Sequence, residues 1–214
     1  MREKKVIMIA AMTLCGRISP APLGSAVDRR FLEAVRDKTD ASLMGGNTLR
    51  HGDPEMRGSV CGRHRLRALI TMSGDIPVAG KKIFAQGPKP LVFCGDGVHA
   101  GLGERLRGRA ELIALPLLDG FLSIAAAIRE LEKRGAGSIL VEGGAILNYR
   151  ALRERVVDEI LVTITPQLFG GEGAPSLVEG VGSLGCPFLA LELLSCRQEK
   201  NGELFTHYRV KYEE

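Results

Sequence analysis

The chain has 214 residues, of which 45% are apolar and 25% are charged, and its formal net charge is +4. This places it among ordinary globular proteins, and the scattered arginines give no dense basic tract of the kind that binds nucleic acid. The five cysteines form no C-x-x-C pair and follow no secretory signal, and no apolar run approaches the roughly 18 residues that cross a bilayer. We therefore expect a cytoplasmic protein with neither a metal site nor a membrane span.

In the first half of the chain, predicted strands alternate with predicted helices. We expect strands over residues 6–13, 41–44, 90–94 and 112–115, an apolar segment over 68–72, a helix that begins near Asp28, and a helix over 98–106. The first helix places Phe31, Leu32 and Val35 at inward-facing positions. The second strand leads into a loop over residues 45–56.

The second half contains the clearest helical signal and then changes character. A helix is expected over residues 120–134, capped by Asp119, because apolar residues recur at helical spacing and Gly135 follows. A strand over 139–141 and a helix over 145–155 come next. The last third reads as strands over 160–165, 189–196 and 204–212, with QEKNGEL as a hairpin turn.

This order of elements predicts the fold class. Strands that alternate with helices favour a mostly parallel sheet covered on both faces, and the last strands favour an antiparallel end of the same sheet. No linker or internal repeat interrupts the pattern. We therefore predict one α/β domain over residues 1–214, with three α/β/α layers and an antiparallel C-terminal hairpin.

The sequence EGG, residues 142–144, stands where a strand becomes a helix. Glycine tolerates positive φ there, and the free N–H groups of the following helix attract anions, so a phosphate site is one interpretation. A tight turn that needs glycine for geometry alone is the other. The stretches AMTLCGRIS and GGNTLRHGDP also follow strand ends, where open α/β sheets bind their ligands. Three such loops favour a site for a phosphorylated small molecule.

With these loops in view, the chain resembles the pyrimidine reductases of riboflavin biosynthesis. The resemblance covers nearly the whole chain and is most specific in LVEGGAILNYRALRERVVDEILVTITPQLFGGEGAPSLVEG, with AMTLCGRI and RDKTDASLMGGNTLRHGDP as further anchors. It looks most like the free-standing archaeal and fungal type. The resemblance implies a dihydrofolate-reductase-like fold, NADPH as cofactor, a homodimer, and reduction of the ribosyl side chain of a ribosylaminopyrimidine 5′-phosphate to ribityl.

The resemblance also implies roles for individual residues. Those matched to the cofactor are Ala11, Thr13, Thr48, Ser73, Gly143, Gly144, Ala145, Ile146, Leu147 and Asn148. Those matched to the substrate are Ser25, Arg36, Met56 and Glu142, with Arg36 as a partner for the phosphate. Glu142 and Asp53 are the candidates for polar orientation in catalysis, and the proton donor stays unassigned, with water as one source.

Each of these positions has an alternative interpretation. Arg36 at a helix end could simply favour the helix dipole, Thr48 could cap a short helix, and Glu142 could be a solvated charge. A cluster of basic residues could be either a solvated loop or a phosphate site; its members are Arg57, Arg63, His64, Arg65 and Arg67.

The sequence departs from the family's usual pattern at three positions. Cys15 stands where the family has an aspartate in S/T-L-D-G, Gly52 replaces the first of two aspartates before a proline, and Val27 stands where bacterial members often have tryptophan. The signature H-x-E with P-C-x-x-C is missing, so we expect no deaminase activity.

Two other functions stay open. One is another NADPH-dependent reductase of this fold, such as dihydrofolate reductase, which needs a buried acid on the helix after the first loop, where Asp28 and Glu33 lie. The other is a nucleotide-binding protein without catalysis.

Overall fold

A nine-stranded sheet forms the middle layer of the fold. The computed structural model describes residues 4–19, 23–60 and 65–212. The sheet order is β10-β11-β9-β1-β8-β2-β3-β4-β5. Its strands are β1 (Lys5–Thr13), β2 (Ala41–Gly45), β3 (Leu66–Ile70), β4 (Leu91–Cys94), β5 (Glu111–Ala114), β8 (Ser138–Val141), β9 (Glu159–Thr165), β10 (Ala190–Gln198) and β11 (Leu204–Lys211).

The pairing of these strands confirms the predicted mixed sheet. Neighbours from β9 across to β5 run parallel, whereas β11 pairs antiparallel with both β9 and β10. The predicted hairpin turn lies between β10 and β11. Because the parallel strands all end at one edge, the loops after β1, β2, β3, β8 and β9 open on the same side of the molecule.

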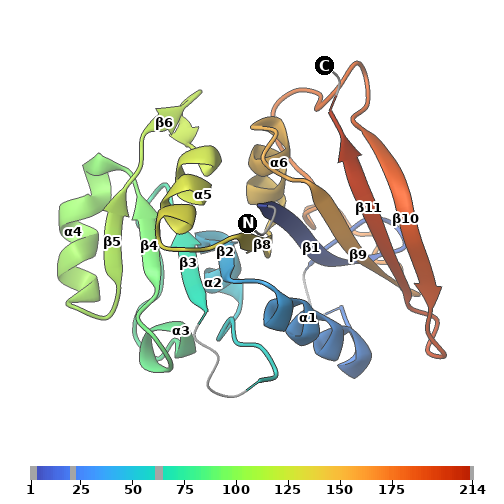
Figure 1. The fold of residues 1–214 in the computed structure, drawn as a ribbon, viewed down its shortest axis with the longest axis horizontal. Coiled ribbons are helices and arrows are strands. Elements are labelled where there is room, and N and C mark those ends of the chain that lie inside the picture. The colour runs from blue at the N-terminus through green and yellow to red at the C-terminus, as the bar shows by residue number, and fades with distance from the viewer. Residues whose placement is uncertain (1–3, 20–22, 61–64, 213–214) are drawn as a thin grey trace.

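Helices cover both faces of this sheet (Figure 1). The helices α5 (Ile124–Lys133) and α6 (Ala145–Arg153) lie on one face. The opposite face carries α1 (Ala26–Lys38), α2 (Gly46–His51), α3 (Lys82–Ala85) and α4 (Asp96–Leu106). This arrangement confirms the predicted three layers. No helix in the described part of the chain is long and apolar enough to span a membrane.

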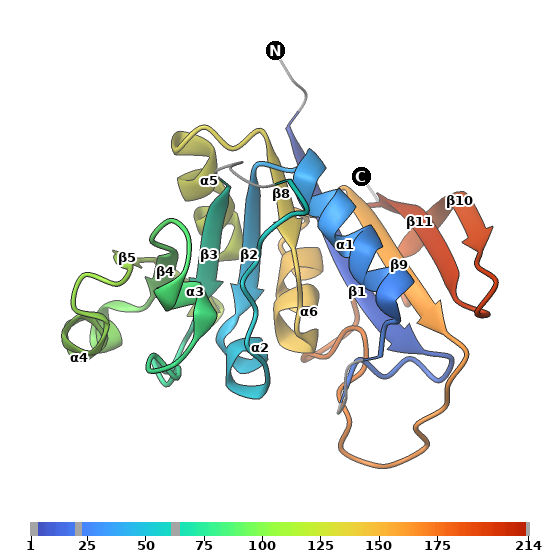
Figure 2. The same ribbon diagram turned by 90° about the horizontal axis from the view of Figure 1, so that it is seen from below.

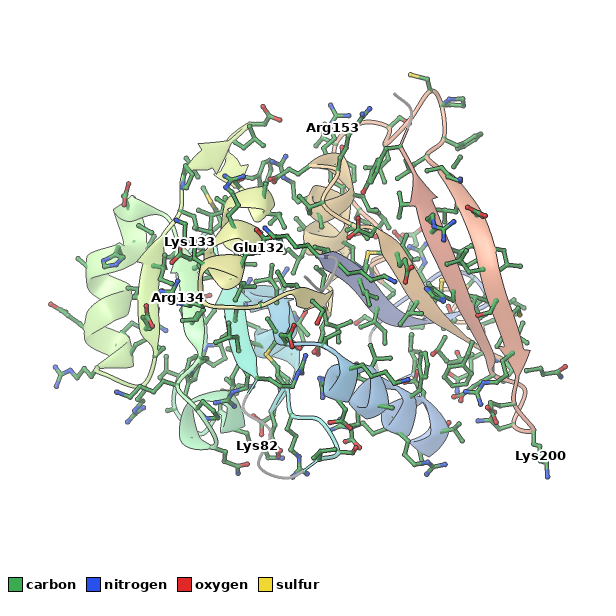
Figure 3. The ribbon with its side chains drawn as sticks, in the orientation of Figure 1. Lys82, Glu132, Lys133, Arg134, Arg153 and Lys200 are labelled. Atoms are coloured by element: carbon green, nitrogen blue, oxygen red, sulfur yellow. The ribbon has the colours of Figure 1, made fainter. Side chains whose placement is uncertain are left out.

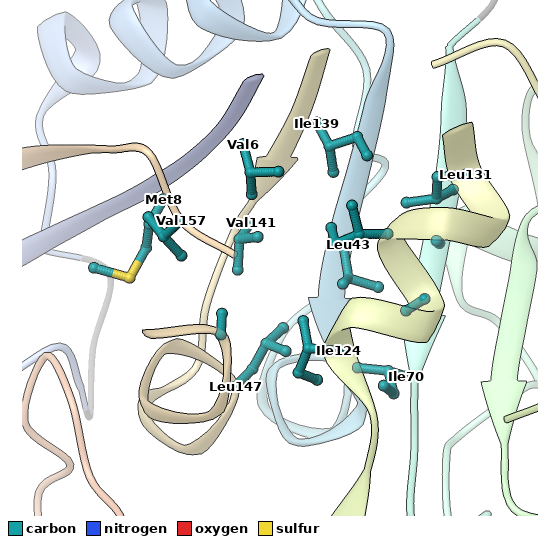
Figure 4. Close-up of a cluster of buried hydrophobic side chains, with 14 of the residues drawn as sticks. Val6, Met8, Leu43, Ile70, Ile124, Leu131, Ile139, Val141, Leu147 and Val157 are labelled. Atoms are coloured by element: carbon teal, nitrogen blue, oxygen red, sulfur yellow. The ribbon is translucent and has the colours of Figure 1, made fainter. Parts of the chain in front are cut away.

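The largest apolar cluster lies under α5 and α6. The side chains of Val6, Leu43 and Ile70, from three strands, pack in one cluster with Ile124 of α5 and Leu147 of α6 (Figure 4). Alternation along each strand sends the next residue to the other face, where Leu69 and Val92 pack against α3 and α4, and Leu161 packs against α1. The predicted inward positions Phe31, Leu32 and Val35 of α1 are confirmed by that last cluster.

Two local predictions were wrong. The helix expected from residue 120 begins at Ile124, and its N-cap is Ser123, whose Oγ accepts from Ala126 N at 3.1 Å. Asp119 and Gly120 instead take positive φ in the turn between two short strands, β6 (Leu117–Leu118) and β7 (Phe121–Leu122). An Asp-Gly pair favours that hairpin turn over a helix start.

The second difference is the loop expected over residues 45–56. It begins as α2, with the backbone of Gly45 at its N-cap and no side-chain cap. A six-residue helix without a capping side chain leaves little signal in a sequence.

Candidate functional site

Two of the three predicted loops meet directly at the carboxyl edge of the sheet. The Gly45 N–H donates to the Gly143 carbonyl at 3.1 Å, and the Glu142 N–H donates to the Leu43 carbonyl at 2.9 Å. A Cβ added to Gly144 would lie 3.4 Å from Thr48 Oγ1. The third loop follows β1, which is the neighbour of β8 in the sheet. The three loops therefore begin at the same edge of the sheet, as predicted.

The EGG turn has the geometry expected of a glycine corner. Gly143 has φ +78°, a conformation that costs other residues about 1–2 kcal/mol, and the peptide bond between Gly143 and Gly144 is cis. Gly144 is the N-cap of α6 and no side chain caps that end. The first helical turn places Ile146 outward, 53% exposed, while Ala145 and Leu147 are buried. The N–H groups at the start of α6 are therefore free of side-chain competition for an anion.

Asn148 supports the same interpretation from inside the turn. Its side chain is fully buried, and its Nδ2 donates to the Leu177 carbonyl at 2.8 Å, but its Oδ1 has no hydrogen-bond partner among the described residues. The Nδ2 and Oδ1 atoms of Asn148 each lie 3.6 Å from the position that a Cβ added to Gly143 would take. Buried polar atoms are normally paired, so an orphaned oxygen beside the glycine turn fits a ligand group that completes the site.

The Glu142 side chain is buried and paired with Arg36, which excludes the solvated-charge alternative. Arg36 donates two hydrogen bonds to the Glu142 carboxylate, from Nε to Oε1 at 3.0 Å and from Nη2 to Oε2 at 2.6 Å. Ser42 Oγ donates a third to Oε1 at 2.5 Å. Both charged side chains are 4% exposed. Burial acts to raise the pKa of Glu142, but the charge and hydrogen bonds of Arg36 and the Ser42 hydroxyl outweigh it, so the pKa lies below its ordinary value.

This ion pair bears on the phosphate role predicted for Arg36. The third donor of the fork, Nη1, goes to the Arg57 carbonyl at 3.0 Å, so all three directions of the guanidinium meet protein acceptors. Arg36 does stand in the last turn of α1, where a cation suits the helix dipole, but its guanidinium is bound to Glu142, the residue after β8. No local sequence pattern predicts the pairing of Arg36 with Glu142. The role of Ser42 was also missed. Ser42 lies two residues before Met44 on β2, and this spacing could have indicated which face of the sheet its side chain is on.

Ser25 is held by local bonds at the start of α1. Its Oγ accepts from Val27 N at 3.0 Å as the N-cap, and donates to Glu203 Oε2 at 2.7 Å. The Ser25 N–H donates to Glu203 Oε1 at 2.9 Å. Glu203, at the end of the β10–β11 turn, is 2% exposed. Sequence reasoning missed this carboxylate, which is 178 residues away in the chain.

The end of β1 is fixed by contacts within the protein. Thr13 is buried, and its Oγ1 accepts from Arg17 N at 3.0 Å and contacts Cys15 Sγ at 3.2 Å. Ala11 stands opposite Thr163 of β9. The thiol of Cys15 is exposed, and hydrogen bonds with Thr13, Gly170 and Phe169 lower its pKa to about 7.

Other predicted residues lie away from the EGG turn or are occupied. Asp53 Oδ1 accepts at 2.9 Å from the N–H of Lys82, the first residue of α3, which is labelled in Figure 3. Ser73 is exposed on the loop after β3, where its Oγ accepts from Asp75 N at 3.2 Å. Met56 is fully buried in the cluster under α3 and α4, so only its backbone could meet a substrate.

The described members of the basic cluster differ: the side chain of Arg57 is 70% exposed, as in a solvated loop, whereas Arg65 and Arg67 are buried. Arg65 and Arg67 are each 6% exposed, and they donate to backbone carbonyls, of Thr39 at 3.0 Å and of Glu55 at 3.1 Å. Arg63 and His64 lie outside the described residues. Among the residues that the structure describes, no group of histidine, cysteine or acidic side chains could hold a metal ion.

The sequence profile of one known family, the RibD C-terminal domain, matches residues 4–205. The chain belongs to this family. The match includes the EGG turn and every strand of the sheet except most of β11, which extends to Lys211.

Relatives of the RibD family with assigned names are similar over most of their own length. The chain is 27% identical over 194 residues to the Aquifex aeolicus protein named 2,5-diamino-6-ribosylamino-4(3H)-pyrimidinone 5′-phosphate reductase, with 85% of each chain covered. A Methanothermobacter thermautotrophicus protein of the same name is 29% identical over 185 residues, with 83% of this chain and 84% of that one covered.

Two solved structures share the fold. A pyrimidine reductase-like protein from Corynebacterium diphtheriae superposes with a TM-score of 0.75 at 20% identity, covering 99% of this chain and 94% of that one. The Saccharomyces riboflavin biosynthesis reductase Rib7 superposes with a TM-score of 0.74 at 18% identity, covering 99% and 91%. The predicted fold class is thereby confirmed.

Proposed function

We propose that the protein reduces the ribosyl side chain of a ribosylaminopyrimidine 5′-phosphate to ribityl, as a step of riboflavin biosynthesis. The observation that carries this proposal is the family match over residues 4–205 on a chain whose three loops converge at one sheet edge. The names of the relatives from Aquifex and Methanothermobacter support the same reaction.

We propose NADPH as the cofactor. When bound, it supplies a hydride for C1′ of the sugar. The start of α6, the Gly143–Gly144 turn, Thr48 and the buried Asn148 would hold its phosphate-bearing part, since this region combines uncapped N–H groups with an orphaned oxygen. Ala11 and Thr13 would lie along the nicotinamide, and Ser73 is the candidate near the 2′-phosphate.

Glu142 acts in this proposal as a fixed acceptor. It stays ionised at neutral pH because Arg36 and Ser42 bind it, so it orients donor groups of the substrate and gives no proton. Arg36 is then a positioning residue for Glu142, in place of the predicted phosphate role. Asp53 similarly positions the start of α3.

The test is the oxidation of NADPH at 340 nm by the purified protein, with the diamino and the deaminated ribosylaminopyrimidine phosphates and dihydrofolate offered separately. We expect turnover of one ribosylaminopyrimidine, which would also identify the form that is used. Turnover of dihydrofolate alone would favour the alternative function, that of a dihydrofolate reductase. The observation that supports this alternative is the partly buried acid Asp28 on α1. Binding of NADPH without any turnover would favour a non-catalytic protein.

We also propose a homodimer and a cytoplasmic location. A mostly apolar hollow of about 310 Å³ opens beside β9 and β11 on the α6 face, and the edge strand β10 exposes Leu191 and Leu193 next to it. A second copy that covers this surface would remove an exposed apolar edge. The described cysteines Cys15, Cys94, Cys186 and Cys196 are all unpaired, which fits a reducing compartment.

A further inference from the structure

Asp28 is the one acidic side chain on the first turns of α1 that turns toward the sheet beneath the helix. The hydroxyl of Thr163, on β9, donates a hydrogen bond to its carboxylate. The backbone of Gly24 covers it closely, since a Cβ added to Gly24 would lie 1.8 Å from Asp28 Oδ2. Neither contact is needed to start the helix, because Ser25 already caps it.

The helix α1 connects this carboxyl group with Glu142. Figure 2 shows α1 running across the sheet over β1 and β9. Its beginning lies on β9 through Asp28 and Thr163, its middle packs on β11 through the rings of Phe31 and Phe205, and its end reaches β8 through Arg36 and Glu142.

Strand alternation places both carboxyl groups on the same face as the end of β1. Ile9, Leu140 and Leu161 pack under α1, so the residues two positions further along, Ala11, Glu142 and Thr163, also face that side. β1 lies between β8 and β9 in the sheet. The carboxyl groups of Glu142 and Asp28 therefore flank the end of β1 from its two sides.

The surroundings push the two groups in opposite directions. The guanidinium of Arg36 and the hydroxyl of Ser42 bind the carboxylate of Glu142 and lower its pKa. For Asp28, burial raises the pKa, the Thr163 hydroxyl lowers it, the negative charge of Glu203 raises it and Arg29 lowers it, with a net upward shift. Two carboxyl groups whose pKa values are driven apart across one site are the usual pattern of an acid opposite a fixed anion.

We infer that Asp28 is the acid that opens the sugar ring of the substrate, opposite the fixed carboxylate of Glu142. This inference rests on the proposed function. The protonated carboxyl gives its proton to the ring oxygen O4′ while the bond between O4′ and C1′ breaks, and that electron pair stays on the oxygen as a hydroxyl group. The lone pair of the glycosylamine nitrogen forms the C1′=N bond. A proton from water restores the acid.

The charged groups that face Asp28 are Glu203, from the β10–β11 turn, and Arg29 on its own helix. From β9 it meets the neutral Thr163, and from β1 the neighbouring position is Ala11. Removing the charge of Glu203 should therefore lower the pKa of Asp28, and removing the Thr163 hydroxyl should raise it. This pair of opposite effects distinguishes Asp28 from any other acid in the site.

The experiment is the pH dependence of kcat for the wild type and the variants Asp28→Asn, Thr163→Val and Glu203→Gln, with Glu33→Gln as the control. Glu33 lies on the same helix and pairs with Arg29 at 2.9 Å. A general acid must be protonated, so kcat should fall as the pH rises through its pKa. We expect Asp28→Asn to lower kcat about 10²–10⁴-fold while substrate still binds, measured by calorimetry without cofactor.

The two neighbouring variants keep the acid and so guard against a simple loss of folding. Thr163→Val should move the falling limb to higher pH and Glu203→Gln to lower pH, while Glu33→Gln leaves it in place. A second readout is independent of turnover: ¹³C NMR of the Asp28 carboxyl in the protein alone should titrate above the ordinary value of 3.8.

The outcomes separate this inference from the proposed function. An inactive wild type would overturn both. With an active wild type, any of three results would overturn the acid role alone. These are a change in kcat of less than twofold in Asp28→Asn, a falling limb of the pH profile that Thr163→Val and Glu203→Gln do not move, and titration of Asp28 at or below 3.8.

Discussion

Glu142 combines two demands that are usually met by different residues. It must stay charged in a place that is almost closed to water, and it must still point at the site. The bidentate grip of Arg36 meets the first demand, because a buried carboxylate keeps its charge only when it is paired and hydrogen-bonded. In the proposed function, its position directly after β8 meets the second.

The first prediction concerns this pair. Glu142→Gln leaves the Arg36 charge buried without its partner and should destabilise the fold by about 3–5 kcal/mol in urea unfolding at pH 7. It should also weaken substrate binding or turnover more than NADPH binding. Equal loss of both ligands would contradict the substrate role.

The pH dependence of that loss has a definite sign. The folded pKa of Glu142 lies below the ordinary value of 4.5, so the stability from its charge is fully present above that value and is lost as the pH falls through the folded pKa. The difference in unfolding free energy between the wild type and Glu142→Gln should shrink in acid. A difference that grows as the pH falls would show that the carboxyl is protonated in the fold.

A third prediction concerns Cys15, which lies in the loop after β1. Hydrogen bonds with Thr13 and with the backbone at Gly170 and Phe169 lower its pKa to about 7. The thiolate is the reactive form, so alkylation by iodoacetamide should rise with a midpoint near pH 7. Peptide mass spectrometry would follow it, with Cys94 as a buried control whose pKa is raised by burial. A midpoint near 9 would contradict the described contacts.

At the scale of elements, the strand-to-helix turn carries the cofactor proposal. Sequence reasoning predicted this turn because two glycines between an apolar strand and a helix leave few other interpretations. The sequence prediction was wrong at the start of α5, because Asp119 and Gly120 form a hairpin turn. It was also wrong at α2, because this helix is short and has no capping side chain that a sequence would show. Contacts between distant elements, such as α1 with β8, depend on the tertiary fold and leave no local pattern.

The glycine turn can be tested with two matched variants. Gly143→Ala and Gly135→Ala both force a side chain into positive φ, at +78° and +93°, so each should lose about 1–2 kcal/mol of stability. A Cβ at Gly135 meets open space, whereas a Cβ at Gly143 faces Asn148. Only Gly143→Ala should weaken NADPH binding, measured by fluorescence titration. Equal affinities in the two variants would contradict a cofactor site at this turn.

At the scale of the whole molecule, one sheet carries two different surfaces. Its carboxyl edge collects the polar loops, while the antiparallel end leaves an apolar hollow and an open strand edge. The sequence predicted a mostly parallel sheet and its polar edge, because the alternation of strands with helices and the chemistry of the loops are local patterns. It could not predict the hollow, which arises only when β9, β11 and the chain after α6 come together.

The homodimer belongs to this scale. Light scattering after size exclusion should give twice the mass of one chain for the wild type. Leu193→Arg on β10 should shift it toward one chain, whereas Leu117→Arg, equally exposed on β6, should not. A wild type that elutes as a single chain, or variants that behave alike, would contradict an interface at β10.

The most direct measurement is to follow the transferred hydrogen. The protein would be given NADPH that carries deuterium on the transferred face of nicotinamide C4, with the ribosylaminopyrimidine phosphate that supports turnover. The product would then be examined by mass spectrometry and ²H NMR. We predict one deuterium, located at C1′ of the new ribityl chain. A product without deuterium at C1′, or no product from either pyrimidine, would contradict the proposed reaction.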